Sequence, residues 1–463
     1  FTQRAQAYPE KRAAAERAQD FLEIARPYIL AKAEEQAGRC SQCGVPFCQV
    51  HCPLHNNIPD WLKLTAEGRL EEAYEVSAAT NAMPEICGRI CPQDRLCEGN
   101  CVIEPGFGSV TIGSVEKFIT DNAWEQGWVK PLKPVADRSG QSVGIIGAGP
   151  AGLTAAEALR VKGYEVHVYD RHDRAGGLLT YGIPGFKLEK PVVMRRVERL
   201  AAGGVHFHQG FAVGVDASLE ELRARHDAIL IATGVYRARS VDVPGADGEH
   251  VLEALDYLTS SNRSDFGVAL PAAHDAAGRH VVVIGGGDTA MDCVRTAVRQ
   301  GAASVKCLYR RDRANMPGSA REVANAEEEG VEFVWLAAPA AITAAGVEAQ
   351  GMRLGQPGAD GRRNPEPDAD HRFVARADLV IKALGFDPED LPTAFGAPDL
   401  PVTRWGTLRI DHKTMMTGLD GVFAAGDIVR GASLVVWAVR DGRDVAQQMH
   451  QYLRARVASS AAA

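Results

Sequence analysis

The stretch SVGIIGAGPAGLTAAEALRVKGYEVHVYD, residues 142–170, decides the fold, because it reads as strand, glycine-rich turn, helix and second strand. Gly147, Gly149 and Gly152 give G-x-G-x-x-G directly after the first strand. The first glycine of such a turn permits the tight bend, the second lets backbone approach a pyrophosphate, and the third lets the helix pack closely on the strand. Asp170 ends the second strand, roughly 20 residues further on, where an acid can bind ribose hydroxyls. The stretch predicts a dinucleotide-binding βαβ unit.

A second βαβ pattern follows at residues 279–311, where Gly285, Gly287 and Ala290 give G-x-G-x-x-A. The two units differ at the end of their second strand, which reads VYDR in the first and LYRR in the second. Asp170 would repel a 2′-phosphate, whereas Arg310 and Arg311 would attract one through charge-assisted hydrogen bonds. The first unit therefore predicts a site for a bare ribose and the second a site for NADP(H). The alternative is that these arginines, with Arg313, form a solvated basic turn.

The two repeated units set the predicted organisation of the 463 residues. We expect an α/β fold class, with two Rossmann-like dinucleotide-binding domains preceded by an α-helical domain. The predicted boundaries are 1–140 for the helical domain, 141–250 with 376–463 for a discontinuous first dinucleotide-binding domain, and 251–375 for the second, NADPH-binding domain. Within the helical domain, residues 12–39 are expected to form a helix with an apolar face. That face comprises Phe21, Leu22, Ile24, Ala25, Tyr28 and Ile29.

The overall composition restricts the class of protein. With 46% hydrophobic and 24% charged residues, the chain is typical of a globular protein. A formal net charge of −8 argues against a nucleic-acid partner. The apolar runs are too short to span a bilayer, and the amino terminus lacks the apolar core of a signal peptide. We therefore expect a cytoplasmic protein with no membrane partner, in a compartment that disfavours disulfides.

Eight of the ten cysteines are grouped near the amino terminus, in two runs of four. The first run is C-x2-C-x4-C-x3-C and the second is C-x3-C-x5-C-x3-C, comprising Cys40, Cys43, Cys48 and Cys52, then Cys87, Cys91, Cys97 and Cys101. Structural zinc usually uses paired C-x2-C knuckles, and only one such pair is present. Two [4Fe–4S] clusters need eight ligands. The grouping therefore favours iron–sulfur clusters over zinc or disulfides, while Cys293 and Cys307 are expected to be inert packing residues.

Further motifs carry a resemblance to known proteins. GIIGAGPAGL, DRAGGLLTYGIP (173–184), ILIATG (229–234) and GVFAAGDI (421–428) resemble the FAD-domain motifs of the two-dinucleotide flavin oxidoreductases. The whole ordered set resembles the small (β) subunits of bacterial NADPH-dependent glutamate synthases. The same module recurs in the amino-terminal half of dihydropyrimidine dehydrogenase and in the large subunit of the NADH-dependent ferredoxin:NADP+ oxidoreductase. The resemblance covers nearly the full length.

The resemblance implies two nucleotide sites. The FAD site is expected to contain Gly147, Gly149, Pro150, Ala151, Gly152, Asp170, Arg171, Gly177, Leu178, Gly182, Thr233, Gly234, Gly426, Asp427 and Trp437. The NADPH site is expected to contain Gly285, Gly286, Gly287, Asp288, Thr289, Ala290, Arg310 and Arg311.

The same resemblance implies that the cysteine runs interleave. Cys40, Cys43, Cys48 and Cys101 would hold one cluster, and Cys52, Cys91 and Cys97 the other. The fourth ligand of the second cluster would be Glu116 rather than Cys87, and this choice stays open. No catalytic side chain is expected, because FAD and NADPH carry the hydride transfer.

The implied function is that of an NADPH-oxidising subunit. NADPH would reduce FAD, and electrons would leave through the clusters to a large (α) subunit that makes L-glutamate from L-glutamine and 2-oxoglutarate. Two alternatives remain: the large subunit of an NADH-dependent ferredoxin:NADP+ oxidoreductase, or a redox-sensing module in which NADPH turnover is incidental.

Overall fold

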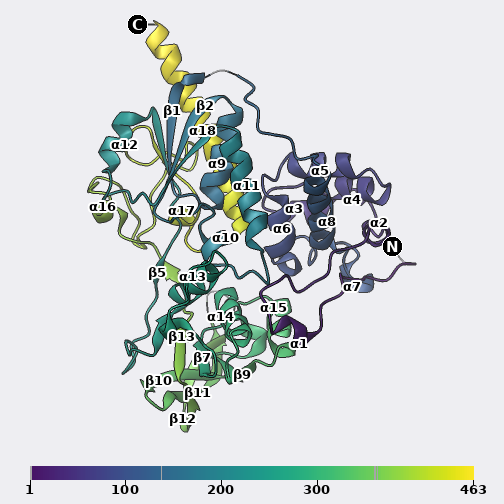
Figure 1. The fold of residues 1–463 in the computed structure, drawn as a ribbon, viewed down its shortest axis with the longest axis vertical. Coiled ribbons are helices and arrows are strands. Elements are labelled where there is room, and N and C mark those ends of the chain that lie inside the picture. The colour runs from purple at the N-terminus through teal and green to yellow at the C-terminus, as the bar shows by residue number, and fades with distance from the viewer. Residues whose placement is uncertain (1–2, 137, 359–360, 362, 463) are drawn as a thin grey trace.

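A computed structural model describes residues 3–136, 138–358, 361 and 363–462. Figure 1 shows a helical amino-terminal part beside two sheet-containing parts, one above the other. The order of the parts agrees with the predicted α/β class. None of the described helices is long and apolar enough to cross a membrane.

The amino-terminal part consists of short helices around a small apolar core. Trp61, Leu62, Val115 and Ile119 are fully buried there. The helices are α1 (Ala14–Arg17), α2 (Leu30–Ala37), α3 (Phe47–Val50), α4 (Ile58–Ala66), α5 (Leu70–Ala78), α6 (Pro84–Ile90), η1 (Gln93–Arg95), α7 (Glu104–Phe107) and α8 (Ile112–Glu125).

The predicted helix over residues 12–39 is wrong in its middle. Only α1 and α2 form, and residues 18–29 between them contain no helix. Pro27 disfavours helical backbone in the residue before it. Lys11 and Ala25 form an isolated antiparallel bridge, so the segment folds back on itself. Leu22 and Ile29 are exposed, which removes two members of the expected apolar face.

The first parallel sheet has the strand order β15-β4-β1-β2-β3. One apolar face is covered by α9 and by the long carboxy-terminal helix α18, which pack on one another (Figure 1). Its strands are β1 (Arg138–Ile146), β2 (Tyr164–Asp170), β3 (Val205–Gln209), β4 (Ala228–Ile231) and β15 (Val422–Ala424). Its helices are α9 (Pro150–Val161), α10 (Leu178–Tyr181), α11 (Lys190–Ala202), α12 (Leu219–Arg225), α16 (Leu391–Ala394), α17 (Asp427–Arg430) and α18 (Val435–Ala462).

The second parallel sheet has the order β6-β13-β7-β8-β9. Its strands are β6 (Val251–Glu253), β7 (His280–Ile284), β8 (Ser304–Tyr309), β9 (Glu332–Trp335) and β13 (Leu379–Lys382). Its helices are α13 (Ala254–Ser264), η2 (Ala272–His274), α14 (Asp288–Arg299), η3 (Arg313–Asn315) and α15 (Ala320–Glu328). The structure differs from the expected boundary at residue 376, because β13 pairs with β6 and β7 before the chain returns to the first sheet.

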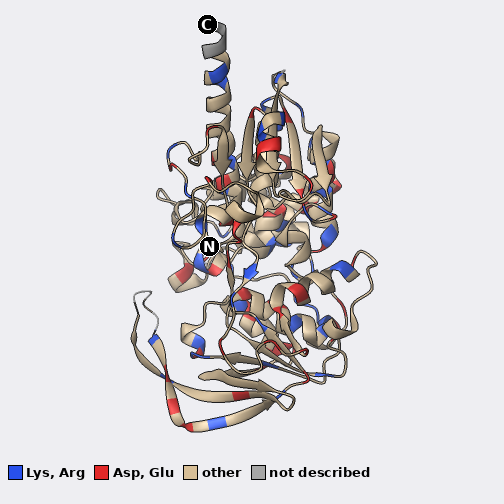
Figure 2. Ribbon diagram, turned by 90° about the vertical axis from the view of Figure 1, so that its left-hand side faces the viewer, with Lys and Arg blue, Asp and Glu red and all other residues tan. Residues whose placement is uncertain are grey.

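Two smaller sheets complete the fold. An antiparallel sheet comprises β10 (Ala337–Thr343), β11 (Gly346–Pro357) and β12 (Arg363–Arg376). Figure 2 shows the β11–β12 hairpin reaching away from the body of the molecule. In the same view, acidic and basic residues are interspersed along the ribbon. Strands β5 (Arg237–Ala238) and β14 (Phe386–Asp387) pair where the chain crosses between the two sheet-containing parts.

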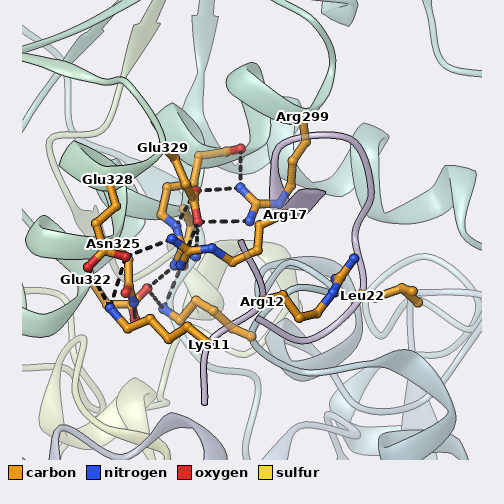
Figure 3. Close-up of polar contacts among 12 residues, drawn as sticks. Lys11, Arg12, Arg17, Leu22, Arg299, Glu322, Asn325, Glu328 and Glu329 are labelled. Atoms are coloured by element: carbon orange, nitrogen blue, oxygen red, sulfur yellow. Dashed lines mark hydrogen bonds and ion pairs between the residues drawn. The ribbon is translucent and has the colours of Figure 1, made fainter. Parts of the chain in front are cut away.

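Ion pairs of Arg17 join the helical part to the second sheet-containing part, beside a buried cluster around Glu329. Glu329 accepts hydrogen bonds from Arg295 and Arg299, and Arg17 of α1 contacts Glu328 at 2.7 Å (Figure 3). Burial opposes the charged carboxylate, but hydrogen bonds from Arg299 and Arg295 lower the pKa of Glu329 to about 2. The amino-terminal segment is therefore held against the end of α15 by the ion pairs of Arg17 with Glu328 and, at 3.5 Å, with Glu329.

Candidate cofactor sites and their family

The first glycine-rich turn joins β1 to α9 in a cramped backbone arrangement. Gly147 has φ +106°, and a Cβ there would lie 2.4 Å from the carbonyl oxygen of Ala232. A Cβ on Gly152 would lie 2.0 Å from the carbonyl oxygen of Gly147. A Cβ on Gly149, in contrast, would meet nothing within 4 Å. The backbone is therefore crowded at Gly147 and Gly152 and leaves open space at Gly149. The turn leads into the amino terminus of α9, where free N–H groups favour phosphate.

Asp170 lies directly beside this turn. Its carboxylate oxygens accept hydrogen bonds from the backbone N–H groups of Ala148, at 2.7 Å, and His172, at 2.8 Å. These bonds fix a buried carboxylate at the end of β2, next to the phosphate cradle. A carboxylate retains acceptor capacity after two bonds, so it fits ribose hydroxyls as donors.

The remaining glycines expected at this site lie against the first turn or next to a short helix or strand. Gly177 and Gly426 lie against the turn, because Cβ atoms on them would come within 3.0 Å of Gly149 Cα and Ala151 Cβ respectively. The hydroxyl of Thr233 is buried without a protein partner among the described residues, as expected of a group that meets a ligand. Leu178 begins α10 and Gly182 follows its end, while Gly234 has φ +75° after β4. Pro150 and Ala151 form the first turn of α9.

The environments of Asp427, Arg171 and Trp437 differ from one another. Asp427 begins α17, and burial raises its pKa to about 6. Arg171 pairs with Glu389 at 2.8 Å and lies over the ring of Tyr236. The Trp437 ring has Arg430 and Arg440 over it, at 4.5 and 5.3 Å from its centroid. The contacts of Trp437 are therefore those of a residue packed between arginines.

The second turn joins β7 to α14 and repeats the backbone arrangement. Gly285 has φ +150°, and a Cβ there would lie 2.3 Å from the carbonyl oxygen of Ala383. A Cβ on Gly286 would lie 2.4 Å from the Tyr309 ring, whereas one on Gly287 would meet nothing within 4 Å. Ala290 is fully buried. Asp288 accepts a hydrogen bond from the backbone of Ser319 at 2.8 Å, and Thr289 faces a cavity described below.

The structure separates the two arginines expected to bind a 2′-phosphate. Arg310 follows β8 and is exposed. Arg311 is buried, and its Nε donates to the backbone carbonyl of Arg363 at 2.8 Å, at the start of β12. Arg313 pairs with Glu327 and is also exposed. Of the expected pair, Arg310 is therefore accessible to a ligand, while Arg311 is hydrogen-bonded to the hairpin.

The structure brings four cysteines of the first predicted set together. Burial, and then the neighbouring thiols of Cys101, Cys40 and Cys43, raise the pKa of the Cys48 thiol to about 12. Burial likewise raises the pKa of Cys40, with Cys101 and Cys43 beside it. All ten cysteines are within the described chain and are free thiols. Four adjacent, unpaired thiols suit a cluster whose ligands are thiolates.

The second predicted set lines one small cavity. Cys52, Cys91 and Cys97 face it together with both alternatives for the fourth position, Cys87 and Glu116. The rest of the wall is mainly apolar and includes Leu54, Ile58, Trp61, Leu96, Ile112 and Val436. The donor set and its dry surroundings fit a [4Fe–4S] cluster.

Glu116 and Cys87 share the amide of Asn81. Oε1 of Glu116 accepts from Asn81 Nδ2 at 3.2 Å, and also from Asn56 and Ser77. Sγ of Cys87 donates to Asn81 Oδ1 at 3.7 Å. Burial raises the pKa of Glu116 to about 8. Both groups are buried and held at the cavity, so the geometry keeps both in reach of the second set.

Sequence reasoning missed a cavity of about 890 Å³ where the three parts of the molecule meet. It is lined by Cys91 of the helical part, Thr289 at the second turn and Leu434 at the start of α18. Inside it, Lys187 Nζ lies 2.9 Å from Asp292 Oδ1. Burial raises the pKa of Asp292 to about 6, although Lys187 opposes this rise. Lys187 and Asp292 are far apart in the sequence, so no local pattern indicated that they pair.

Fold and sites define the class: an oxidoreductase with two dinucleotide-binding domains and an iron–sulfur domain. Residues 17–128 match the family model "dihydropyrimidine dehydrogenase domain II, 4Fe-4S cluster". Residues 141–442 match the model of the pyridine nucleotide-disulphide oxidoreductases. A solved structure of FprA from Mycobacterium tuberculosis in complex with NADPH has the same fold. It is 19% identical, with a TM-score of 0.58 over 71% of this chain and 86% of that one.

Closer relatives define the family. The small chain of glutamate synthase [NADPH] from Azospirillum brasilense is 66% identical over 98% of this chain and 96% of the relative. The corresponding Escherichia coli K12 protein is 44% identical over 94% of each chain. The E. coli putative oxidoreductase AegA is also 44% identical, over 96% of this chain but 69% of its own length. This chain belongs to the family of glutamate synthase [NADPH] small chains, and the resemblance inferred from its motifs is confirmed.

Proposed function

We propose that this chain takes electrons from NADPH in the cytoplasm and passes them to a large glutamate synthase subunit, which makes L-glutamate from L-glutamine and 2-oxoglutarate. When bound, NADPH, FAD and two [4Fe–4S] clusters supply hydride donation, conversion of a two-electron step into single-electron steps, and one-electron transfer. The chain's own residues bind these groups, orient them and keep water out.

One observation carries the proposal: the cavity at the junction of the three parts. A volume of about 890 Å³ falls within the range of pockets that hold small molecules and cofactors. Its wall combines Thr289 and Asp288 at the second glycine-rich turn with Ser433 and Leu434 before α18, and with Cys91. The expected NADPH site and the second cluster set therefore border the same space, next to the segment that leads into α18.

We assign the two nucleotides by the charge beside each turn. The first turn binds FAD, with its phosphates at Gly149 and a ribose at Asp170, which supplies acceptors but no positive charge. The second turn binds NADPH, with phosphates at Gly287 and the 2′-phosphate at Arg310. Arg310 suits this role because an exposed guanidinium can form two parallel hydrogen bonds with a phosphate.

We assign Cys40, Cys43, Cys48 and Cys101 to one cluster and Cys52, Cys91 and Cys97 to the other. The contacts among the first four thiols and the shared cavity of the other three support this division. Glu116 is our choice for the eighth ligand, with Cys87 as the alternative. Three donors already orient the Glu116 carboxyl at the cavity, whereas the Cys87 thiol interacts with the Cys91 thiol and weakly with Asn81.

The large subunit is proposed to dock beside the first cluster. Val45, Phe47 and Val50 are exposed among the cysteines of the first run, and Val102 and Phe107 are exposed beside Cys101. Exposed apolar side chains gathered around one feature mark interaction sites more often than isolated ones do. A partner on this face would meet the first cluster set. This set is the one further from the nucleotide cavity, because only the second set contributes lining residues to that cavity.

The test is a gentle anaerobic purification from the native cell, with co-purifying chains identified and iron, sulfide and flavin counted. We expect a large amidotransferase-like partner, one FAD and eight irons on this chain. A small flavin–iron partner would instead indicate a ferredoxin:NADP+ oxidoreductase. AegA contains a similar region within a longer chain, so sequence similarity does not identify the partner and the purification is needed. Negligible NADPH–dye turnover by FAD-loaded protein would indicate a redox sensor.

Ligand substitutions test the cluster assignment separately. Cys101→Ser should reduce the iron content and perturb one cluster, in spite of its distance in sequence from Cys40. Glu116→Gln should alter the electron paramagnetic resonance spectrum of the other cluster, while the matched Cys87→Ala should leave it unchanged. Two intact clusters in Cys101→Ser, or a reversed pattern for Glu116 and Cys87, would refute the respective assignment.

A further inference from the structure

A group of histidines lies on the first sheet, away from the cysteines. Glu165 and His167 are two residues apart on β2, so their side chains project from the same face of the sheet. His206 on β3 is the direct partner of His167 in the parallel register. We propose that Glu165, His167 and His206 bind a divalent transition-metal ion of the zinc type.

The three side chains are already close enough for a shared ion. One ligand atom from each lies within 4.8 Å of the others, and Glu165 Oε1 is 3.0 Å from His167 Nε2. The rings of His167 and His206 are stacked, with centroids 4.8 Å apart. Ligands of tetrahedral zinc, with bonds of about 2.0–2.2 Å, lie roughly 3.3 Å apart. Small side-chain rotations would therefore bring the three groups onto one ion, with a fourth position left for water.

A neighbouring histidine is placed to orient the central ligand. With Nε2 of His167 facing Glu165, its Nδ1 lies 2.9 Å from His208 Nε2. Histidines that bind a metal almost always donate their other ring N–H to an acceptor, usually a carboxylate, a backbone carbonyl or water, which fixes ring and tautomer. Here a ring nitrogen of His208 is in the place of that acceptor. His208 is itself held by stacking on Tyr169, at 4.5 Å between centroids. The arrangement thus contains a ligand set and the support behind it.

His226 lies beside the ring of His167, with ring centroids 5.1 Å apart, but is not part of the proposed ligand set. His226 is engaged elsewhere, by the hydroxyls of Tyr169 and Ser142. Glu165 and His206 are accessible, so an ion can enter from solvent.

The site differs in place and consequence from the nucleotide site on the same strand. Asp170 is at the carboxyl end of β2, whereas Glu165 and His167 are in its first half. Because β3 is the edge strand of the sheet, an ion bound to both strands would link β3 to its neighbour β2. A ligand that binds only the folded state stabilises it, so zinc should raise the melting temperature.

The test uses the complete protein with clusters and FAD bound, freed of adventitious metal by a brief chelator wash. Zinc chloride is titrated in competition with a chromogenic chelator, while visible absorbance confirms that the clusters persist. We expect one ion per chain and a zinc-dependent rise in melting temperature. His206→Gln should weaken binding by about 100-fold or more, and His208→Ala by about 10-fold. His412→Ala, at an exposed histidine outside the group, should bind zinc normally.

Zinc K-edge absorption identifies the donor atoms. Nitrogen and oxygen neighbours at about 2.0–2.2 Å support the site, whereas sulfur at about 2.3 Å would assign the zinc to displaced cysteines and overturn it. Equal affinity in His206→Gln and the unsubstituted protein, or no rise in melting temperature with zinc, would also overturn it. Melting curves without zinc show whether His206→Gln remains folded.

Discussion

The two glycine-rich turns share a backbone design but differ in the charge beside it. In both, the first glycine has positive φ and touches a carbonyl oxygen of a neighbouring strand's end, and the middle glycine borders open space. In the first, Asp170 is tied by two backbone N–H groups and presents negative charge. In the second, Arg310 is exposed and positive. Under the proposed assignment, the comparison teaches that the backbone makes the phosphate cradle and that one strand-end residue selects the nucleotide.

The largest expected difference between the turns concerns their third position. Gly152→Val would push side-chain atoms into the carbonyl oxygen of Gly147, which lies 2.0 Å from a Cβ. Overpacking against backbone should lower the free energy of unfolding by about 3 kcal/mol or more and release FAD. Ala290→Gly, the matched change in the second turn, should cost about 1 kcal/mol through helix propensity and leave FAD bound. Denaturant unfolding and flavin content measure both.

Equal losses of stability and of FAD in Gly152→Val and Ala290→Gly would show that the two turns do not differ at their third position. Retention of FAD by Gly152→Val would show that the first turn can widen, and that the close contact of Gly152 with Gly147 is not required for the cradle.

The second expected effect concerns cofactor preference. Arg310→Ala removes the exposed guanidinium and with it charge-assisted hydrogen bonds of about 1.5–3 kcal/mol. The kcat/KM ratio of NADPH to NADH should therefore fall by roughly 10- to 100-fold. Arg313→Ala is the matched control, since Arg313 is exposed in the same turn but paired with Glu327. An unchanged ratio in Arg310→Ala, measured by dye reduction, would remove Arg310 from the site.

Local sequence patterns were sufficient for these two turns but not for what surrounds them. The strand, the glycines and the helix of each βαβ unit are consecutive, so their periodicity predicted both sheets. The division of labour between Arg310 and Arg311 was not predictable, because Arg311 is bound by Arg363 from a distant hairpin. Likewise, the amino-terminal segment read as helix because its apolar spacing is helical, while its actual conformation depends on contacts such as Arg17 with Glu328. Long-range contacts carried the missing information.

The cysteine sites illustrate the same limit. Spacing indicated that clusters are present, but the interleaved pairing came from resemblance. In the structure, Cys101 lies near the first run, and the following helix α8 packs against α2 and α4, which is a tertiary arrangement. The choice between Glu116 and Cys87 depends on an Asn81 amide that contacts both.

The third expected effect is smaller and concerns the first turn alone. Asp170→Asn keeps the shape but replaces a charged acceptor of two backbone hydrogen bonds by an amide with one oxygen. One bond is lost and the other loses its charge, which should cost about 1–2 kcal/mol in the free energy of FAD binding. Flavin fluorescence on dilution measures this change. A matched Asp173→Asn, at an exposed aspartate just after β2, should bind FAD normally; equal weakening in both would make the effect unspecific.

The smallest expected effect tests whether Arg311 belongs to the phosphate site. Arg311→Ala removes the bond to the Arg363 carbonyl, so the free energy of unfolding should fall by about 1 kcal/mol. Because the guanidinium is buried against the hairpin, the preference for NADPH over NADH should change far less than in Arg310→Ala. A fall in the kcat/KM ratio as large as that of Arg310→Ala would show that Arg311 leaves the hairpin to bind phosphate. In that case the second turn selects its nucleotide with two residues, and the one-residue contrast with Asp170 fails.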